Sequence, residues 1–179
     1  MAKVSYNYTR AKSLKRRQKE KKQNEHSKSK RKRYPKTDRT VRAGASDPCR
    51  YPAGYFIPGT TKYTNEELAQ MIKDDTKPIY VAADENDNCL GYAFCQLREQ
   101  PFSNNMVPFT SLFIDDLCVD ASTRGQHIGE KLFVHVKEEA KRLGCYEVTL
   151  NVWAGNTSAE KFYEKMGLKT KEQQMEYIL

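Results

Sequence analysis

Apolar and polar residues follow two different periods along the chain, and together these periods predict a mixed α/β protein. Apolar, β-prone runs at residues 78–83, 89–97 and 111–119 predict three strands, and the turn-forming letters DENDN join the first two as an antiparallel hairpin. Residues 146–152 predict another strand. Residues 168–179 are expected to add one or two closing strands.

Three other segments have helical spacing. Residues 63–72 carry a capping-box signal, in which Thr64 is followed three positions later by Glu67. Residues 128–143 and 157–167 predict two further amphipathic helices, each closed by a glycine. The expected apolar face of the first of these two helices consists of Ile128, Leu132, Phe133, Val136, Ala140 and Leu143.

The order of the elements predicts the topology. The strand at residues 112–119, the helix after it and the strand at residues 146–152 form a unit suited to parallel pairing, because the helix can cross over the sheet. We therefore expect one α/β (α+β) domain with a mixed, mostly antiparallel central sheet flanked by helices.

Charge divides the chain into two parts. Residues 1–50 contain 18 Lys and Arg against 4 Asp and Glu, a net charge of +14, whereas residues 51–179 contain 13 against 19, a net charge of −6. The domain is expected at residues 51–179. Residues 12–50 have Leu14 and Val41 as their only large aliphatic side chains, too few to offset the entropy of ordering the segment, so disorder is expected there.

The basic segment leaves its own role open. A tract such as KSKRKR attracts phosphates, which would let residues 12–42 contact a nucleic acid or a ribosome. A solvated tail without a fixed partner is the alternative. Residues 4–11 are a candidate for a first strand.

Cysteine spacing and hydropathy bear on the compartment. None of the five cysteines forms a C-x-x-C pair, which predicts reduced thiols and a cytoplasmic location. No run approaches the ~20 apolar residues of a membrane span, and the charged start lacks the apolar core of a signal peptide. A soluble protein without membrane contact and without a metal is expected.

The stretch VDASTRGQHIG, residues 119–129, connects a predicted strand to a predicted helix. The first N–H groups of a helix lack partners and carry the positive end of the helix dipole, so such a turn attracts anions. Gly125 and Gly129 let a ligand approach the backbone, and Arg124 adds a cation suited to phosphate. A pyrophosphate fits this turn, although similar glycines also occur where a turn only tightens a crossover.

Two motifs in the correct order make the chain similar to a known family. DDLCVDASTRGQHIGEKL, followed after one strand by LNVWAGNTSAEKFYEKMGL, resembles the GNAT superfamily of acetyl-CoA-dependent N-acetyltransferases over residues 51–179. The resemblance implies acetyl-CoA as co-substrate and an amine as acceptor, and it leaves the oligomeric state open, a homodimer included. It implies cofactor contacts from Leu117, Cys118, Val119, Arg124, Gly125, Gln126, His127, Ile128, Gly129 and Asn156.

The resemblance also implies catalytic roles. Asp115 and Asp116 adjoin in a predicted strand and are expected to face opposite sides of the sheet, with Asp115 the better candidate for the base or the anchor of the acceptor amine. Tyr163 matches the family tyrosine that protonates or hydrogen-bonds the departing sulfur. Each of these residues also has a purely structural alternative. The two aspartates would be solvated or capping charges at an irregularity of the sheet. Tyr163 would be a core aromatic residue, and Asn156 would only cap its helix.

Two departures from the family pattern need an account. His127 stands where the family usually has its first motif glycine, and a negative φ is expected there, as in a helical first turn, so that the backbone donors survive. Residues 12–50 lack the apolar stripe of the family's first two helices. Either they are a natural basic extension with a shortened lid, or the reading frame is wrong there. Because a family-like pattern begins, vanishes and resumes near residue 51, the sequence favours a frame problem.

The expected activity is transfer of an acetyl group from acetyl-CoA to a primary amine of a small molecule or protein, by direct attack in a ternary complex. An acyl-cysteine route through Cys118 is less favoured because no His/Asp constellation accompanies that residue. The rival hypothesis is a catalytically impaired acyl-CoA-binding module whose basic tail binds RNA or ribosomes.

Overall fold

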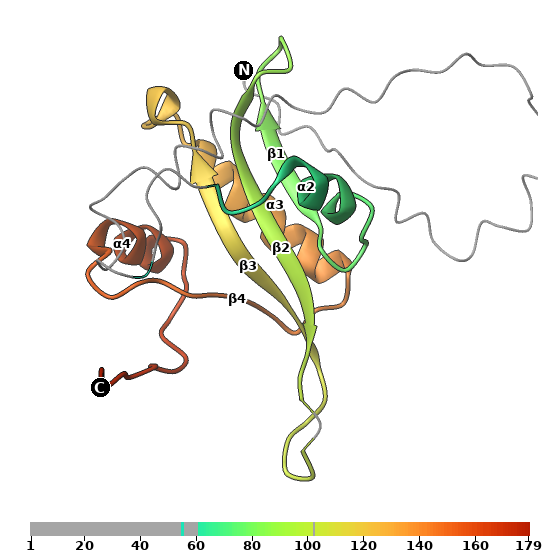
Figure 1. The fold of residues 1–179 in the computed structure, drawn as a ribbon, viewed down its shortest axis with the longest axis vertical. Coiled ribbons are helices and arrows are strands. Elements are labelled where there is room, and N and C mark those ends of the chain that lie inside the picture. The colour runs from blue at the N-terminus through green and yellow to red at the C-terminus, as the bar shows by residue number, and fades with distance from the viewer. Residues whose placement is uncertain (1–54, 56–60, 102) are drawn as a thin grey trace, which may run out of the picture.

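A four-stranded sheet forms the centre of the molecule, with the strand order β1-β2-β3-β4 (Figure 1). The computed structural model describes Tyr55, residues 61–101 and residues 103–179. The strands are β1 (Ile79–Ala83), β2 (Cys89–Glu99), β3 (Thr110–Val119) and β4 (Glu147–Leu150). The basic segment at residues 12–50 and the strand expected at residues 4–11 lie outside the described residues.

Pairing between the strands is mixed and mostly antiparallel, which confirms the predicted fold class. β1 pairs with β2, and β2 with β3, in antiparallel fashion, whereas β3 and β4 are parallel. The predicted hairpin turn is present: the Asp84 carboxylate accepts hydrogen bonds from the N–H groups of Asn86 and Asn88, each at 2.8 Å. Asp87 takes a left-handed φ of 61°, which aspartate tolerates in turns.

Helices cover both faces of the sheet (Figure 1). α2 (Asn65–Met71) lies on one face and begins with the predicted capping box: Thr64 Oγ1 accepts from the Glu67 N–H at 3.2 Å, and Glu67 Oε2 accepts from the Thr64 N–H at 2.7 Å. α3 (Ile128–Arg142) crosses the opposite face. α4 (Thr157–Lys165) follows β4 and lies beside β3.

Each face of the sheet has its own apolar cluster. Five of the six side chains predicted for one face of α3 are at most 3% exposed: Ile128, Leu132, Phe133, Val136 and Ala140. They pack against strand residues such as Ala93 and Leu112. On the other face, a smaller cluster joins Tyr92 and Phe94 to α2. The alternation of the strand residues between the two clusters explains why both faces carry a helix.

β3 continues beyond its pairing with β4. The parallel ladder covers only Ser111 to Ile114 of β3, whereas pairing with β2 extends to Val119. Among the described residues, the backbone of residues 115–119 therefore has a strand partner on one edge only. The parallel pairing itself was predicted, and it ends at Ile114 of β3.

A bulge interrupts β3 at Asp115. Phe94 of β2 pairs with Asp116, and the next residue, Cys95, pairs with Ile114, so Asp115 is the extra residue on its strand. A bulge breaks the strict alternation of side chains. The expectation that Asp115 and Asp116 face opposite sides of the sheet is wrong for this reason, as their partners show below.

The closing strands expected within residues 168–179 are not formed, and that prediction is wrong. All of these residues are described, and none belongs to a helix or a strand. Residues 169–174, KTKEQQ, are polar throughout, so they offer no alternating apolar face to extend the sheet beyond β4. The large apolar side chains at the end of the segment are exposed: Met175, Tyr177, Ile178 and Leu179.

Candidate active site

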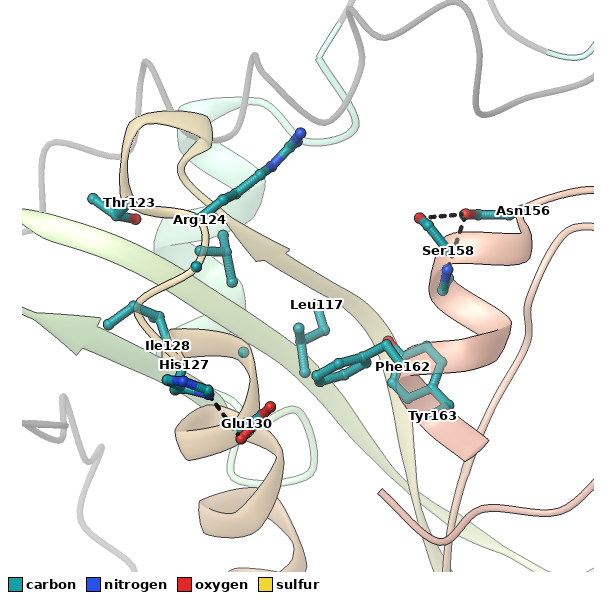
Figure 2. A pocket seen from close by; sticks show the side chains of 14 residues that line it. Leu117, Thr123, Arg124, His127, Ile128, Glu130, Asn156, Ser158, Phe162 and Tyr163 are labelled. Carbon is teal, nitrogen blue, oxygen red and sulfur yellow. Dashed lines mark hydrogen bonds and ion pairs between the residues drawn. The ribbon is translucent and has the colours of Figure 1, made fainter. Parts of the chain in front are cut away.

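A pocket of about 350 Å³ opens between the start of α3 and α4 (Figure 2). Leu117 and Val119 of β3 contribute its apolar part. The loop from β3 to α3 forms one wall, and α4 forms the other. The pocket is therefore built from the two motifs that the sequence singles out and from the part of β3 that extends past β4.

The loop after β3 is shaped by turns that its residues encode. Asp120 Oδ1 accepts a hydrogen bond from the Ser122 N–H at 2.8 Å and caps the short 3-10 turn η1 (Ala121–Thr123). Gly125 then takes a φ of +82°, a conformation in which a side chain is strained. Glycine at position 125 therefore suits the backbone conformation of this loop.

His127 is the residue immediately before α3, and its backbone is left-handed, with φ 60° and ψ 21°. The expectation of a negative φ is wrong because His127 is the N-cap and does not belong to the first helical turn. Histidine adopts this conformation more readily than most residues. Its side chain makes no cap bond to the helix, so it leaves the first N–H groups of α3 to other partners.

Charged side chains surround the loop. Glu130 lines the pocket, forms an ion pair with Lys165 Nζ of α4 and lies 3.1 Å from His127 Nδ1. The bonds from Lys165 and His127 hold the pKa of Glu130 below its ordinary value. Figure 2 shows the Arg124 side chain extending away from His127 and Glu130. The negative charge in the pocket is therefore balanced by its own partners, and Arg124 adds a separate positive charge.

α4 begins at the pocket. The side chain of Asn156 accepts a hydrogen bond from the Ala159 N–H at 3.3 Å and so caps the helix, while Asn156 also lines the pocket. The two roles that the sequence left open for this residue are therefore compatible in space.

Tyr163 combines a packed ring with a place on the pocket wall. Its ring makes edge contacts with Phe133 and Phe162, at centroid distances of 6.2 and 5.1 Å. Burial, together with the charge of Asp116, raises the pKa of Tyr163 to about 12. The hydroxyl therefore stays protonated at neutral pH, where it acts as a hydrogen-bond donor and not as a phenolate base.

The two aspartates of β3 do not line the pocket. Asp115 Oδ2 accepts hydrogen bonds from the Tyr63 hydroxyl at 2.5 Å and from Lys62 Nζ at 2.7 Å. Burial opposes ionisation of Asp115, but the bonds from Lys62 and Tyr63 outweigh it, so the pKa of Asp115 is below its ordinary value. Asp116 Oδ2 accepts from the Tyr92 hydroxyl at 3.2 Å.

These partners place both carboxylates on the same side of the sheet. Tyr63 and Tyr92 belong to the apolar cluster on the α2 face. Burial and the hydrogen bond to Asp115 raise the pKa of Tyr63, and the charges of both aspartates raise it further. The bulge therefore gathers two carboxylates where a regular strand would have separated them.

Comparison with known proteins adds to this geometry. The model of the Acetyltransferase (GNAT) family matches residues 47–168, more than half of the chain. The chain belongs to the GNAT acetyltransferase family. The resemblance carried by the two motifs is confirmed, and GNAT homologues identify an acetyl-CoA-dependent N-acetyltransferase.

Individual relatives of this GNAT domain differ in the acceptor for which they are named. A glucosamine 6-phosphate N-acetyltransferase of Arabidopsis thaliana is 37% identical over 121 residues, which covers 65% of this chain and 78% of the relative. A peptidyl-lysine N-acetyltransferase of Salmonella typhimurium is 31% identical over 105 residues, 58% of this chain and 59% of the relative. A crystal structure of a Bacillus halodurans protein superposes with a TM-score of 0.66 at 25% identity, covering 70% of this chain and 80% of the other.

Most of the predicted cofactor residues of the GNAT domain come together in the pocket. Those that line it are Leu117, Val119, Arg124, Gly125, His127, Ile128, Gly129 and Asn156. Cys118 and Gln126 do not line it. Cys118 belongs to the cluster on the opposite face of the sheet, so only its main chain is placed to meet a ligand on this side.

Sequence reasoning missed several residues of the pocket. The residues that also line it are Thr123, Glu130, Ser158, Ala159 and Phe162. Ser158 and Ala159 precede Phe162 by four and three positions, so helical spacing was the available signal for this wall.

Further properties of the GNAT domain apply to the described residues. The described residues include the cysteines Cys89, Cys95, Cys118 and Cys145, which form no disulfide bond. No helix in this part of the chain is long and apolar enough to cross a membrane. Nor does the same part contain three or more His, Cys, Asp or Glu side chains grouped so that they could hold a metal ion.

Proposed function

We propose that the pocket binds acetyl-CoA, with the diphosphate at residues 124–129 and the pantetheine arm along the unpaired edge of β3. One observation carries this proposal: a single pocket contains the glycine loop, the extended part of β3 and Tyr163. The uncapped start of α3 and the Arg124 guanidinium supply the charge that a diphosphate needs. Residues Leu117 to Val119 supply main-chain groups for an extended amide-containing ligand.

Tyr163 is proposed as the donor to the leaving sulfur. Its pKa of about 12 keeps the hydroxyl protonated, so it can hydrogen-bond a developing thiolate. A thiol has an ordinary pKa of about 8.5, so complete proton transfer from this phenol to the sulfur is uphill by several kcal/mol. Stabilisation of the thiolate by a hydrogen bond is therefore the larger part of the role.

Asp115 is proposed as the anchor of the acceptor amine. An alkylammonium with a pKa of about 10.4 must lose a proton before it attacks, which costs roughly 4.6 kcal/mol at pH 7. Because the pKa of Asp115 is lowered, its carboxylate is a weak base and a stable counter-ion. It therefore suits binding and orientation of a cationic amine better than removal of the proton.

The proposed acceptor is a cationic primary amine of a small molecule or of a protein lysine. The two carboxylates gathered at the bulge favour a positively charged acceptor. The relatives named for glucosamine 6-phosphate and for peptidyl lysine are consistent with an amine in either setting. The amine nitrogen is proposed to attack the thioester directly, because the Cys118 side chain packs on the face of the sheet opposite the pocket.

Thiol release from acetyl-CoA across a panel of amines tests this function. The panel includes glucosamine 6-phosphate, a polyamine and a lysine peptide. We expect release of CoA that depends on at least one amine and that decreases in Tyr163→Phe. Binding of acetyl-CoA without release for any amine, together with tight, salt-sensitive binding of RNA, would support the rival acyl-CoA-binding module instead.

A further inference from the structure

A lysine of the chain itself occupies the carboxylate that we propose for the acceptor. The Lys62 ammonium lies 2.7 Å from Asp115 Oδ2, and its Nζ also lies 3.4 Å from the Asp115 carbonyl oxygen. The Lys62 side chain remains 45% exposed, whereas that of Asp115 is only 19% exposed. A flexible primary amine is thus held at a fixed, largely covered anion.

The anion is fixed by the fold. Asp115 is the extra residue of the β3 bulge, and the Tyr63 hydroxyl donates to the same Oδ2 atom at 2.5 Å. Tyr63 is in turn packed edge-on against Phe94, at a centroid distance of 5.4 Å. Lys62 therefore meets a carboxylate whose orientation is set by partners other than itself.

The same carboxylate is close to the pocket along the chain, while its partner Tyr63 places it on the α2 face of the sheet. Leu117, two residues after Asp115, lines the pocket together with Tyr163. Asp115 is also the first residue of β3 beyond the ladder with β4, which ends at Ile114. Under the proposed function, an amine held at Asp115 occupies the position of the acceptor.

We propose that Lys62 is an acetylation site of this chain, modified by the chain's own active site. This inference rests on the proposed function. The Lys62 nitrogen attacks the thioester carbonyl, so a C–N bond forms and the C–S bond breaks. The ammonium gives up two protons in all; one ends on the sulfur as the free thiol, and the other goes to solvent. The product amide is uncharged, so the ion pair with Asp115 is lost.

The chain offers a matched control in Lys77. Its side chain is also 45% exposed and is also paired with an aspartate, Asp74, at 3.6 Å. Asp74 lies in the turn between α2 and β1 and is 37% exposed. Lys77 thus gives the rate at which acetyl-CoA in solution acetylates a paired surface lysine without the active site.

The test is site-resolved mass spectrometry of the full chain incubated with acetyl-CoA and no added amine. We expect Lys62 to be acetylated about tenfold or more faster than Lys77, because its amine is positioned at the site. The rate per chain should not change when the protein is diluted, since the reaction occurs within one molecule. Lys62→Arg should remove the fast modification, and Lys77→Arg should leave it unchanged. Equal rates at the two lysines would overturn the proposal.

Two further measurements separate acetylation at the site from direct reaction of the lysine with acetyl-CoA in solution. Gly125→Glu places a negative charge in the loop proposed for the diphosphate. In this variant the acetylation rate of Lys62 should fall to that of Lys77. Fast acetylation of Lys62 in a folded Gly125→Glu chain would contradict the inference. Thiol release with added amines is measured on the same preparation. If added amines are acetylated while Lys62 and Lys77 react equally, the inference fails and the proposed function stands. If neither lysine nor any added amine is acetylated by the site, both fail.

Discussion

The ring of Phe162 lies against Gly129: a Cβ atom at position 129 would be 3.5 Å from Cζ of the ring and 3.5 Å from Cγ2 of Val119. The first turn of α3, the end of β3 and the inner face of α4 therefore meet at one point on the pocket wall. Contact at 3.5 Å is ordinary van der Waals distance, so a methyl group fits there. A longer side chain must displace the ring.

Gly129→Leu should therefore weaken acetyl-CoA binding by about tenfold or more, because the added side chain pushes Phe162 into the pocket. Leucine is a good helix former, so loss of α3 is not the expected cause. Calorimetric titration measures the effect. Gly129→Ala is the control; it should bind acetyl-CoA as the unmodified chain does and should gain up to about 1 kcal/mol in stability. Equal affinity in Gly129→Leu would contradict the proposed position of the ligand.

Gly91→Ala should destabilise the fold. Gly91 pairs with Val119 across β2 and β3, and a Cβ there would lie 2.7 Å from the carbonyl oxygen of Cys118. The backbone must shift to relieve this overlap, at an expected loss of about 1–3 kcal/mol. Urea unfolding gives the value, with Gly129→Ala as the comparison that lacks a clash. No loss of stability would show that the strands separate more easily here than their pairing indicates.

Tyr163→Phe should lower kcat by about 10²-fold, with little change in acetyl-CoA affinity, because it removes one donor to the leaving sulfur. In the unmodified chain the rate should rise with pH as the acceptor amine loses its proton. A pKa of about 12 means that Tyr163 itself causes no fall in rate up to about pH 10. Steady-state kinetics between pH 6 and pH 10 measure both effects, and Tyr146→Phe, at a residue that is 77% exposed, is the control.

The raised pKa of Tyr163 also predicts alkaline instability. A group whose pKa is higher in the folded state stabilises the fold fully below its unfolded value, here about pH 10, and loses that contribution as the pH rises towards 12. The free energy of unfolding should thus decrease less steeply between pH 9 and pH 12 in Tyr163→Phe than in the unmodified chain. The same slope in both would show that the phenol is not the group that titrates.

Asp115→Asn should raise the KM of the acceptor amine by about tenfold and leave acetyl-CoA affinity unchanged, because the neutral amide loses a charge-assisted bond to the ammonium. Since the pKa of Asp115 is lowered by folding, its stabilising effect is present above about pH 4 and is lost on acidification. Initial rates against amine concentration test the first effect. Asp74→Asn removes another lysine-paired aspartate and serves as the control; an equal increase in KM for both variants would refute the anchor role.

Local signals in the sequence were sufficient for much of the fold. The Thr64–Glu67 capping box, the spacing from Ile128 to Ala140 and the parallel pairing of β3 with β4 were all predicted. Each depends on nearby residues or on the order of neighbouring elements. The same holds for the glycine loop, which could be assigned to the start of α3 before its partners in space were known.

Other features depend on interactions that no local pattern records. The bulge at Asp115 follows from how β2 and β3 align along their whole length, so the strand pattern alone suggested regular alternation. The backbone of His127 is left-handed because α3 begins at the next residue. Sequence patterns do not define the start of a helix to within one residue. The pairing of Lys62 with Asp115 joins residues far apart in the chain, and Lys62 was not among the predicted site residues.

Calorimetric titration with acetyl-CoA tests the central claim most directly, that main-chain groups after β3 hold the diphosphate. We predict saturable binding by the unmodified chain and a loss of about a hundredfold or more in the double variant Arg124→Ala, Gly125→Glu, which removes a cation and adds an anion at the loop. Gly125→Ala introduces the strain of a side chain at φ +82° without the charge, and should retain most of the affinity. Undiminished binding of acetyl-CoA by a folded double variant would contradict the assignment.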